Sequence, residues 1–250
     1  MLVKKWEKLP SFMQKDEIRP YWEQLRKRNW ILFWKRMFDV AVSFLMLLIL
    51  CPLFLVLAIA IKIDSKGPVF FRQLRVTQYG KQFRIHKFRS MAVGSDRGCQ
   101  VTIRNDTRVT IVGRFIRKYK LDEVSQLIDV LQGNMSFVGT RPEVPKYVAS
   151  YTPQMMATLL LPAGITNEAC INFKNEADLL EGVEDIDRIY IDEILPKKMK
   201  WNLLGIKEYG FWKEIWTMFR TFFAVLGIVK PREFIDEWSK SEEQFLTSDK

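Results

Sequence analysis

An uninterrupted apolar segment dominates the hydrophobic pattern of the chain. Residues 41–61 read AVSFLMLLILCPLFLVLAIAI and contain no charged side chain. A helix of this length reaches across the hydrocarbon core of a bilayer, so the pattern predicts a membrane helix. The segment is too long, and begins too far from the N-terminus, to be an ordinary signal peptide.

Pro52 lies near the centre of this segment, directly after Cys51. Proline removes one helical hydrogen-bond donor and clashes with the preceding turn, so we expect a kink at these two residues. Lys35 and Arg36 precede the segment, and Lys62 follows it. Because basic flanks favour the cytoplasmic side, a re-entrant helix that dips into the membrane and returns fits both ends. A kinked single-pass anchor and a buried helix of a soluble core are the alternatives.

Shorter periodicities follow the apolar segment. Residues 68–91 alternate between apolar and basic positions around Tyr79–Gly80, which predicts short strands and a turn. Residues 101–120 begin strand-like and become helical from about Thr110. Residues 121–135 carry one apolar helical stripe, which predicts another helix. The fold expected is α+β and mostly helical, with a small β-hairpin or sheet element.

The two ends of the chain are rich in aromatic and basic residues. At the N-terminus, residues 1–34 suit the headgroup region of a membrane, and a soluble N-terminal helix is the alternative. Over 197–229, charges at Lys213 and Glu214 argue against a second span. Amphipathic helices in the membrane interface fit better there, with helices packed on the core as the alternative.

These patterns divide the chain into five parts. We expect a basic, aromatic N-terminal extension at 1–34, a re-entrant membrane helix at 35–66, a central domain with the candidate catalytic residues at 67–195, amphipathic interfacial helices at 196–230 and a polar tail at 231–250.

Charge and composition narrow the classes of function. The net charge of +10 is concentrated in residues 62–120, where fifteen basic and three acidic residues give +12. Such a block attracts phosphorylated ligands, anionic lipid or nucleic acid. The three cysteines form no CxxC pair, which favours a reduced compartment and no zinc site. One histidine, His86, makes a Ser–His–Asp enzyme untenable, and we expect it to be an ordinary strand residue.

The candidate chemistry centres on an adjacent acid pair, Asp122 and Glu123. One carboxylate of such a pair can attack phosphorus while the other holds a metal or manages protons. Potential phosphate-binding side chains occur at Arg117, Arg141, Lys87 and Arg89. Guanidinium groups bind phosphate oxygens in a bidentate manner, and lysine acts as a point charge. Without further context, the acid pair is also typical of ordinary helix capping.

Context comes from four motifs that occur in order. They read KRMFDVAVSFLMLLILCPLF, IKIDSKGPVFFRQLRVTQYGKQFRIHKFRSM, LDEVSQL and GNMSFVGTRPE. From about Lys35 to Thr166 the chain resembles the bacterial sugar transferase family, the monotopic polyprenyl-phosphate phosphoglycosyl transferases. The stretch DEILPKKMKWNL resembles the small, single-domain members.

The resemblance implies a re-entrant helix broken at Cys51–Pro52 and a magnesium-dependent, two-step reaction. By this likeness Asp122 is the nucleophile, which attacks the β-phosphate of a UDP-sugar, expels UMP and holds the phosphosugar covalently. Polyprenyl (undecaprenyl) phosphate then takes the phosphosugar. Glu123 is implied as the second member of the pair and, with Asp122, as a ligand of Mg²⁺.

The remaining residues that the resemblance implies bind the phosphates or the nucleotide; they are Arg117, Arg141, Pro142, Glu143, Lys87 and Arg89. The partners expected are a UDP-sugar, polyprenyl phosphate and membrane lipid, with no nucleic acid; a homodimer stays open. The location expected is the cytoplasmic face of the bacterial inner membrane, and the process is glycoconjugate synthesis.

The chain departs from the family pattern at several positions. Val124 and Ser125 replace Leu-Pro in LDELPQ, Thr140 replaces the first proline of GPRPE, and Cys51 stands where serine is usual. The stretch after Gly164 reads ITNEACINFKNE instead of ITGLAQV. These changes keep the acid pair and the loop arginine, but the sugar cannot be read from the sequence.

Three rival functions are weighed against this interpretation. A membrane-anchored scaffold could use the basic block to bind anionic lipid. A nucleic-acid binder could stack its Phe and Tyr residues on bases, although the apolar segment and the lack of a recognisable binding module argue against it. An inactive family member is disfavoured because Asp122, Glu123 and Arg141 are all present.

Overall fold

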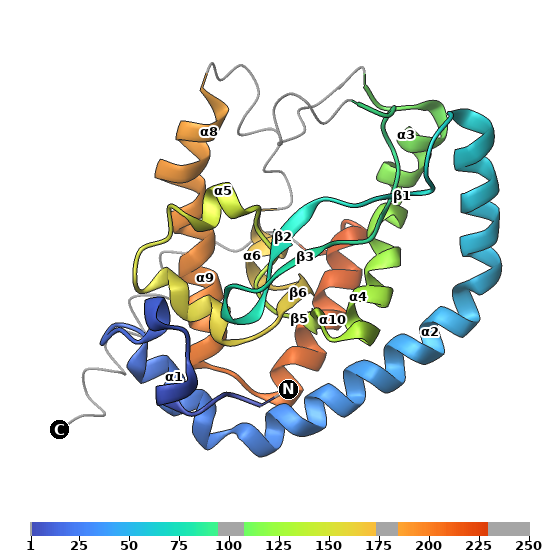
Figure 1. The fold of residues 1–250 in the computed structure, drawn as a ribbon. Coiled ribbons are helices and arrows are strands. Elements are labelled where there is room, and N and C mark those ends of the chain that lie inside the picture. Colours follow the sequence, from blue (N-terminus) through green and yellow to red (C-terminus); the bar gives the residue numbers. More distant parts are fainter. Residues whose placement is uncertain (1, 95–107, 174–184, 230–250) are drawn as a thin grey trace.

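The computed structural model describes residues 2–94, 108–173 and 185–229. Figure 1 shows helices arranged around a few short strands, with one long helix curved around the lower and right-hand edge. The fold is α+β and mostly helical, as the sequence predicted. The expected strand at the start of 101–120 and the polar tail fall outside the described residues.

The strands form three separate pairs. They are β1 (Phe70–Phe71) with β4 (Lys87–Phe88), β2 (Leu74–Val76) with β3 (Gln82–Arg84), and β5 (Met135–Val138) with β6 (Ala163–Thr166). The first two pairs are antiparallel and the third is parallel. The turn between β2 and β3 places Tyr79 and Gly80 at positive φ, which confirms the predicted turn.

The helices described are α1 (Arg19–Lys27), α2 (Asn29–Asp64), α3 (Ile111–Lys118), α4 (Leu127–Gln132), α5 (Pro145–Val148), α6 (Glu168–Asn172), α8 (Ile186–Ile189), α9 (Leu195–Lys207) and α10 (Phe211–Val225). The described residues also contain five 3-10 segments, which are η1 (Trp6–Lys8), η2 (Ser11–Met13), η3 (Gln78–Gly80), η5 (Leu121–Gln126) and η6 (Met155–Leu160). The helix expected over 121–135 therefore consists of η5 followed by α4, and Gly133 ends it in the left-handed conformation.

The long helix α2 begins at Asn29, so the expected boundary at 34/35 falls inside it. The helix continues through Pro52, although the missing N–H leaves the Leu48 carbonyl without its helical donor. Of the described helices, α2 is the one long and apolar enough to cross a membrane, and only 11% of its apolar window is buried. It therefore fits a membrane-associated helix rather than the core helix of a soluble protein.

Both ends of α2 are fixed to the globular body. Near its start, Leu32 is fully buried in the main core, and Arg36 donates to the carbonyls of Val130 and Leu131 in α4. At its end, Asp64 accepts a hydrogen bond from the backbone N–H of Val112 in α3 at 3.1 Å. Between these two ends, one side of α2 packs on the body through partly buried residues such as Leu50, Leu53 and Phe54, while the other side exposes apolar side chains.

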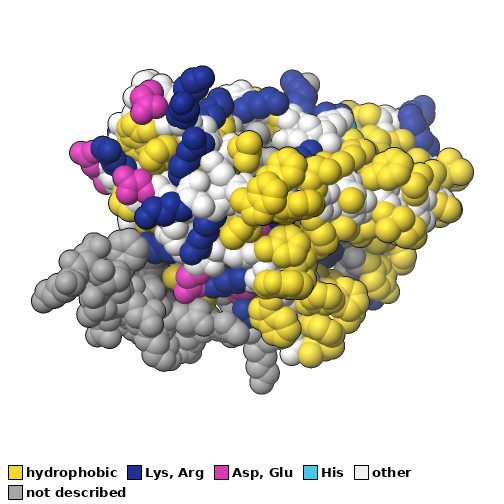
Figure 2. Space-filling model, turned by 90° about the horizontal axis from the view of Figure 1, so that it is seen from below, with side chains coloured by type: hydrophobic (Ala, Val, Ile, Leu, Met, Phe, Trp, Pro, Cys, Tyr) yellow, Lys and Arg dark blue, Asp and Glu magenta, His cyan; other side chains and the backbone are white. Residues whose placement is uncertain are grey.

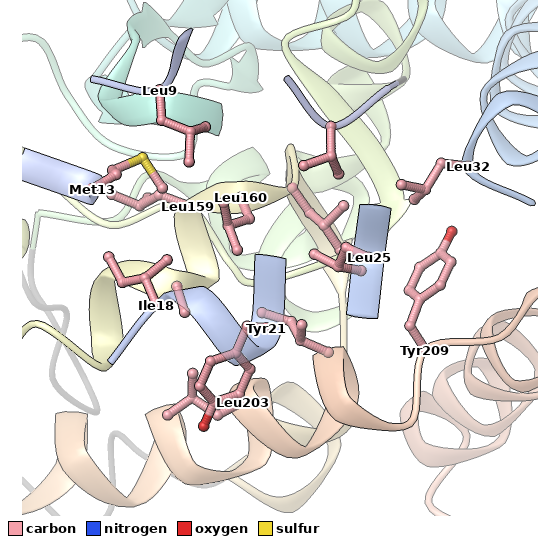
Figure 3. Close-up of a cluster of buried hydrophobic side chains, with 14 of the residues drawn as sticks. Leu9, Met13, Ile18, Tyr21, Leu25, Leu32, Leu159, Leu160, Leu203 and Tyr209 are labelled. Atoms are coloured by element: carbon pink, nitrogen blue, oxygen red, sulfur yellow. The ribbon is translucent and has the colours of Figure 1, made fainter. Parts of the chain in front are cut away.

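The N-terminal segment belongs to the main hydrophobic core. Figure 3 shows Leu9, Met13, Ile18, Tyr21 and Leu25 packed with Leu159, Leu160 and Leu203 from η6 and α9. This arrangement corresponds to the alternative of a helix packed on a soluble domain. Burial of these apolar side chains stabilises the attachment, at about 25 cal/mol for each Å² removed from water.

A continuous apolar surface remains exposed on three helices. Seen from below, hydrophobic side chains cover one part of the molecule, while Lys and Arg side chains gather on the other (Figure 2). Its exposed members include Leu45, Ile49, Leu55, Val56 and Ile63 of α2, Ile111 and Phe115 of α3, and Trp212, Trp216, Phe219 and Phe222 of α10. We call this set the apolar face. Surfaces of this extent are typical of contacts with membranes or other proteins.

A buried ion cluster holds the first half of α2 against the core. The Lys35 ammonium, 0% exposed, donates to Asp39 Oδ1 at 2.7 Å and to Ser136 Oγ of β5 at 2.6 Å. Glu214 of α10 lies 3.3 Å away, so one ammonium serves two carboxylates. Lys35 therefore does not supply the basic membrane flank that the sequence suggested.

We predict that Lys35→Met lowers the free energy of unfolding by about 3 to 5 kcal/mol, because it removes the buried ammonium that pairs with Asp39 and Glu214. Thermal unfolding in detergent or nanodiscs measures the loss. Lys62→Met, on the exposed surface of the same helix, is the control and is expected to change stability by less than about 0.5 kcal/mol. Equal losses in the two variants would contradict the structure.

Glu214 predicts a pH dependence of stability. Burial raises the pKa of Glu214 to about 7, opposed by Lys35 and supported by Asp39. Between the ordinary value of 4.5 and 7, the folded carboxyl keeps a proton that the unfolded one loses, so stability falls as pH rises through this window. The loss is at most about 3 kcal/mol. Glu214→Gln has no titrating carboxyl at this position. The melting temperature of the variant relative to that of the wild type is therefore expected to rise from pH 5 to pH 8. A difference in melting temperature that stays constant over this range would refute the prediction.

Candidate active site

Three segments that are distant in sequence meet around the acid pair. β4 contributes Lys87, η5 contributes Asp122 and Glu123, and the loop after β5 contributes Arg141. Lys120, at φ 54°, separates α3 from η5 and turns the pair towards β4. The predicted site residues Lys87, Asp122, Glu123 and Arg141 are therefore brought together.

Ser125 fixes the turn that carries the acid pair. Its buried hydroxyl lies 3.0 Å from the carbonyl oxygen of His86 and 3.1 Å from that of Asp122. The hydroxyl thus connects η5 to the residue before Lys87. Serine at this position, where the family pattern has proline, takes on a local structural role.

Glu123 is held by two cations. Arg141 donates to both of its carboxylate oxygens, with Nη1 to Oε2 at 3.0 Å, and Lys87 Nζ lies 3.3 Å from Oε1. Burial alone would raise the pKa of Glu123, but the charges of Arg141 and Lys87 hold it far below its usual range. The carboxylate is permanently ionised and orients both cations.

Asp122 differs from Glu123 in its hydrogen bonding and in the direction in which its pKa is shifted. Its Oδ1 is buried and has no hydrogen-bond partner among the described residues. Burial raises the pKa of Asp122, and the nearby charge of Lys87 opposes this rise. A desolvated carboxylate oxygen without a hydrogen bond is a good nucleophile or metal ligand, because no partner has to be displaced first.

Arg117 lies in the last turn of α3, beside the acid pair. Its Nε donates to Ser90 Oγ at 3.1 Å, and its charge acts on the carboxylate of Asp122. Lys120 acts on both carboxylates in the same way, a role that no sequence motif indicated. Arg117 and Lys120 therefore add to the positive charge around the pair.

Arg89 was expected to bind phosphate, but the structure places it elsewhere. Its guanidinium is buried and donates to the carbonyls of Lys66 and Ser65 at 3.0 and 2.7 Å. It also donates to Ser65 Oγ at 2.9 Å. These bonds tie both terminal nitrogens of Arg89 to the end of α2, so Arg89 fixes the helix end, and no hydrogen bond or ion pair joins it to the acid pair within the described residues.

Pro142 and Glu143 make hydrogen bonds to Arg75 and Tyr190 rather than to the acid pair. The Pro142 carbonyl accepts a hydrogen bond from Arg75 at 2.9 Å. The buried Glu143 carboxylate accepts one from the Tyr190 hydroxyl at 2.7 Å. Cys51 and Pro52 are exposed on α2. Within the described part of the chain, no hydrogen bond or ion pair joins these four residues to the acid pair.

His86 has a structural role that the sequence did not reveal. Its backbone N–H donates to Asp129 Oδ2 at 2.8 Å, and its Nδ1 lies 2.8 Å from Oδ1 of the same carboxylate. Arg72 Nη1 lies 2.6 Å from Nε2. Because arginine can only donate, the neutral ring carries its proton on Nδ1. The pair fixes the strand that presents Lys87.

The donor set at the pair fits a magnesium ion in one respect. Mg²⁺ is commonly bound by one or two carboxylates together with water and substrate phosphate, and Asp122 Oδ1 is free to act as such a ligand. Both oxygens of Glu123 already accept hydrogen bonds from Arg141. Within the described ranges, no three His, Cys, Asp or Glu side chains cluster as a metal site.

The comparisons with known proteins establish the class. A family model described as bacterial sugar transferase matches residues 30–227. The chain therefore belongs to the bacterial sugar transferase family, which confirms the resemblance drawn from the motifs.

Several relatives carry specific names. The chain is 39% identical over 195 residues to the "UDP-glucose:undecaprenyl-phosphate glucose-1-phosphate transferase" of Klebsiella pneumoniae, covering 76% of this chain and 39% of that protein. It is 34% identical over 198 residues to an Aeromonas hydrophila "UDP-N-acetylgalactosamine-undecaprenyl-phosphate N-acetylgalactosaminephosphotransferase", covering 78% and 44%. A Bacillus subtilis "Uncharacterized sugar transferase EpsL" is 34% identical over 158 residues, covering 63% and 77%. The chain thus spans about two-fifths of the first two.

We predict that Arg89→Met reduces stability by roughly 2 to 4 kcal/mol, because it removes charged donors from the carbonyls at the end of α2. Arg84→Met is the matched control, since that arginine is exposed on β3. Thermal unfolding at equal detergent concentration compares them. If the two variants melt together, the placement of Arg89 at the helix end is incorrect.

Proposed function

We propose that the protein is a phosphoglycosyl transferase. It moves a sugar-1-phosphate from a UDP-sugar to polyprenyl phosphate, releases UMP and passes through a covalent aspartyl-phosphosugar intermediate. The observation that carries this proposal is the buried, unpartnered Oδ1 of Asp122 beside the Glu123–Arg141–Lys87 cluster.

The reaction requires two displacements at one phosphorus. Asp122 attacks the β-phosphorus of the UDP-sugar, the bond from that phosphorus to the bridging oxygen breaks, and UMP leaves with the bond's electron pair. An oxygen of polyprenyl phosphate then attacks the same phosphorus, which breaks the acyl-phosphate bond and restores the Asp122 carboxylate. No redox partner is needed, and the second step forms the sugar-diphosphate-lipid product.

Arg141 and Lys87 are suited to carry the charge of the diphosphate. Glu123 offsets one of these two cations and an ionised Asp122 offsets the other. Arg117 and Lys120, whose charges also act on Asp122, therefore keep the net charge of the site positive for an incoming phosphate. Preorganised cations in a partly buried site stabilise the charge that develops on the leaving oxygen.

Mg²⁺ is proposed as the cofactor, held by Asp122 and by the diphosphate. When bound, it supplies positive charge that offsets the developing negative charge on the departing UMP. Glu123 joins as a ligand if Arg141 turns from it to the substrate.

The apolar face supports a location at the membrane surface. We propose that α2 enters the bilayer and returns, because both of its ends are fixed to one body while its middle exposes apolar side chains. The exposed aromatic side chains of α10, such as Trp212 and Trp216, suit the interface. This monotopic arrangement, at the cytoplasmic face of the inner membrane, places the site where a lipid-borne phosphate can reach it.

The decisive test is release of UMP by purified protein in nanodiscs with Mg²⁺, undecaprenyl phosphate and a panel of UDP-sugars. The panel includes UDP-glucose, UDP-galactose and UDP-N-acetylgalactosamine, because the relatives are named for different sugars. Release of UDP instead of UMP would mean ordinary glycosyl transfer and would overturn the mechanism.

We predict that Asp122→Asn lowers the rate by at least about 10⁴-fold, because the amide cannot attack phosphorus. It also abolishes a trapped phosphosugar adduct, which intact-protein mass spectrometry detects after incubation with UDP-sugar alone. Asp16→Asn, an exposed carboxylate of the N-terminal segment, is the control and keeps full activity. Unimpaired function of Asp122→Asn would favour a lipid-binding scaffold.

A further inference from the structure

Arg75 is a charged residue behind the site to which neither the sequence motifs nor the proposed reaction gives a role. It lies on β2, and its side chain is 18% exposed. Nη1 donates to the Pro142 carbonyl at 2.9 Å, and Nη2 donates to Gln73 Oε1 at 2.6 Å. Its Nε is buried and has no hydrogen-bond partner among the described residues.

The bond to Pro142 acts on the loop that carries Arg141. Pro142 directly follows Arg141, so its carbonyl belongs to the backbone immediately after the arginine that holds Glu123. The same strand makes a second bond to this loop, from the backbone N–H of Val76 to the carbonyl of Glu143 at 2.9 Å. β2 therefore fixes the loop at two successive residues.

A buried network holds Arg75 in turn. Glu143 Oε2 lies 4.0 Å from its Nη1, and Glu143 Oε1 accepts from the Tyr190 hydroxyl at 2.7 Å. Lys198 Nζ donates to the Tyr190 hydroxyl at 2.9 Å and lies 3.5 Å from Glu143 Oε1. Glu143, Tyr190 and Lys198 are all buried. Tyr190 begins a π-helical turn, a feature often found at functional sites.

The electrostatic environment of Arg75 is unfavourable for its charged form. Burial lowers the pKa of Arg75, the carboxylate of Glu143 raises it, and the charge of Arg141 lowers it further. The charges of the two guanidinium groups therefore repel each other, and the buried Nε of Arg75 has no hydrogen-bond partner among the described residues. A residue selected for packing alone would carry neither penalty.

We propose that Arg75 is a positioning residue for Arg141. Its planar guanidinium bridges Gln73 and the Pro142 carbonyl, and so sets the backbone from which Arg141 reaches Glu123 and the substrate diphosphate. This inference rests on the proposed function. Lysine at position 75 keeps the charge but presents one nitrogen, so it cannot make the same bridge.

The consequence is a loss of activity that depends on Arg141. A displacement of about 1 Å in a positioning group can cost on the order of a hundredfold in rate, and we expect a loss of this size for Arg75→Gln. Arg75→Lys is expected to recover little of it. Once Arg141 is removed, nothing remains for Arg75 to position, so its replacement has little further effect.

A double-mutant cycle tests this. The kcat/KM for UMP release is measured for the wild type, Arg75→Gln, Arg141→Gln and the double variant in nanodiscs. The expected result is that Arg75→Gln costs about a hundredfold in the wild-type background and less than about twofold in the Arg141→Gln background. Losses that multiply would overturn the proposal, since Arg75 would then act on the substrate itself or on overall stability. Wild-type activity of Arg75→Gln would overturn it as well.

Tyr190→Phe provides the second cycle, in case Arg75→Gln does not fold. It removes one hydroxyl from the network and keeps the ring packed on Tyr147. A smaller loss is expected, again only when Arg141 is present, and an equal loss in both backgrounds would overturn the proposal. Wild-type protein that releases no UMP from any UDP-sugar of the panel would refute the proposed function instead, which keeps the two failures distinct.

Discussion

A single partly buried carboxylate, Glu123, organises the site. It draws Lys87 from β4 and Arg141 from the loop after β5 to one point, and these segments are far apart in sequence. Without Glu123, two cations would face each other in a partly buried space, which is unfavourable. With it, the pair of cations is fixed, and the adjacent Asp122 keeps an oxygen without a partner. The contrast between two neighbouring acids follows from this one interaction.

The same logic recurs at larger scale along α2. Lys35 balances Asp39 and Glu214 in the interior, and this cluster joins the helix to β5 and α10. Charges near an apolar segment thus serve the attachment of the helix to the body. The apolar face consists of exposed side chains of α2, α3 and α10.

Features that depend on local pattern could be predicted from the sequence. The long apolar helix, the β2–β3 turn and the acid pair beside Arg141 all follow from runs, spacing and motif. The role of Arg89 could not be predicted, because a basic residue in a phosphate-binding motif looks the same whether it faces a ligand or caps a helix.

Long-range contacts account for the other differences. The sequence of the N-terminal segment suggested an aromatic, basic leader, because its buried residues are interleaved with exposed lysines. Their burial becomes visible only in the contacts that they make with η6 and α9, which are distant in sequence. His86 and its partner Asp129 lie 43 residues apart, so no local signal links them. Even the family match, at residues 30–227, begins after most of this N-terminal segment.

The double attachment of α2 has a consequence for biosynthesis. The groups that fix its two ends, at Val112 on one side and at Ser136 and Glu214 on the other, are all synthesised after the helix itself. A nascent chain that has emerged only to residue 64 carries the apolar helix with Pro52 and its basic flanks, but with neither anchor. If the helix returns as proposed, the contacts that hold both of its ends to the body can therefore form only after that body has been synthesised.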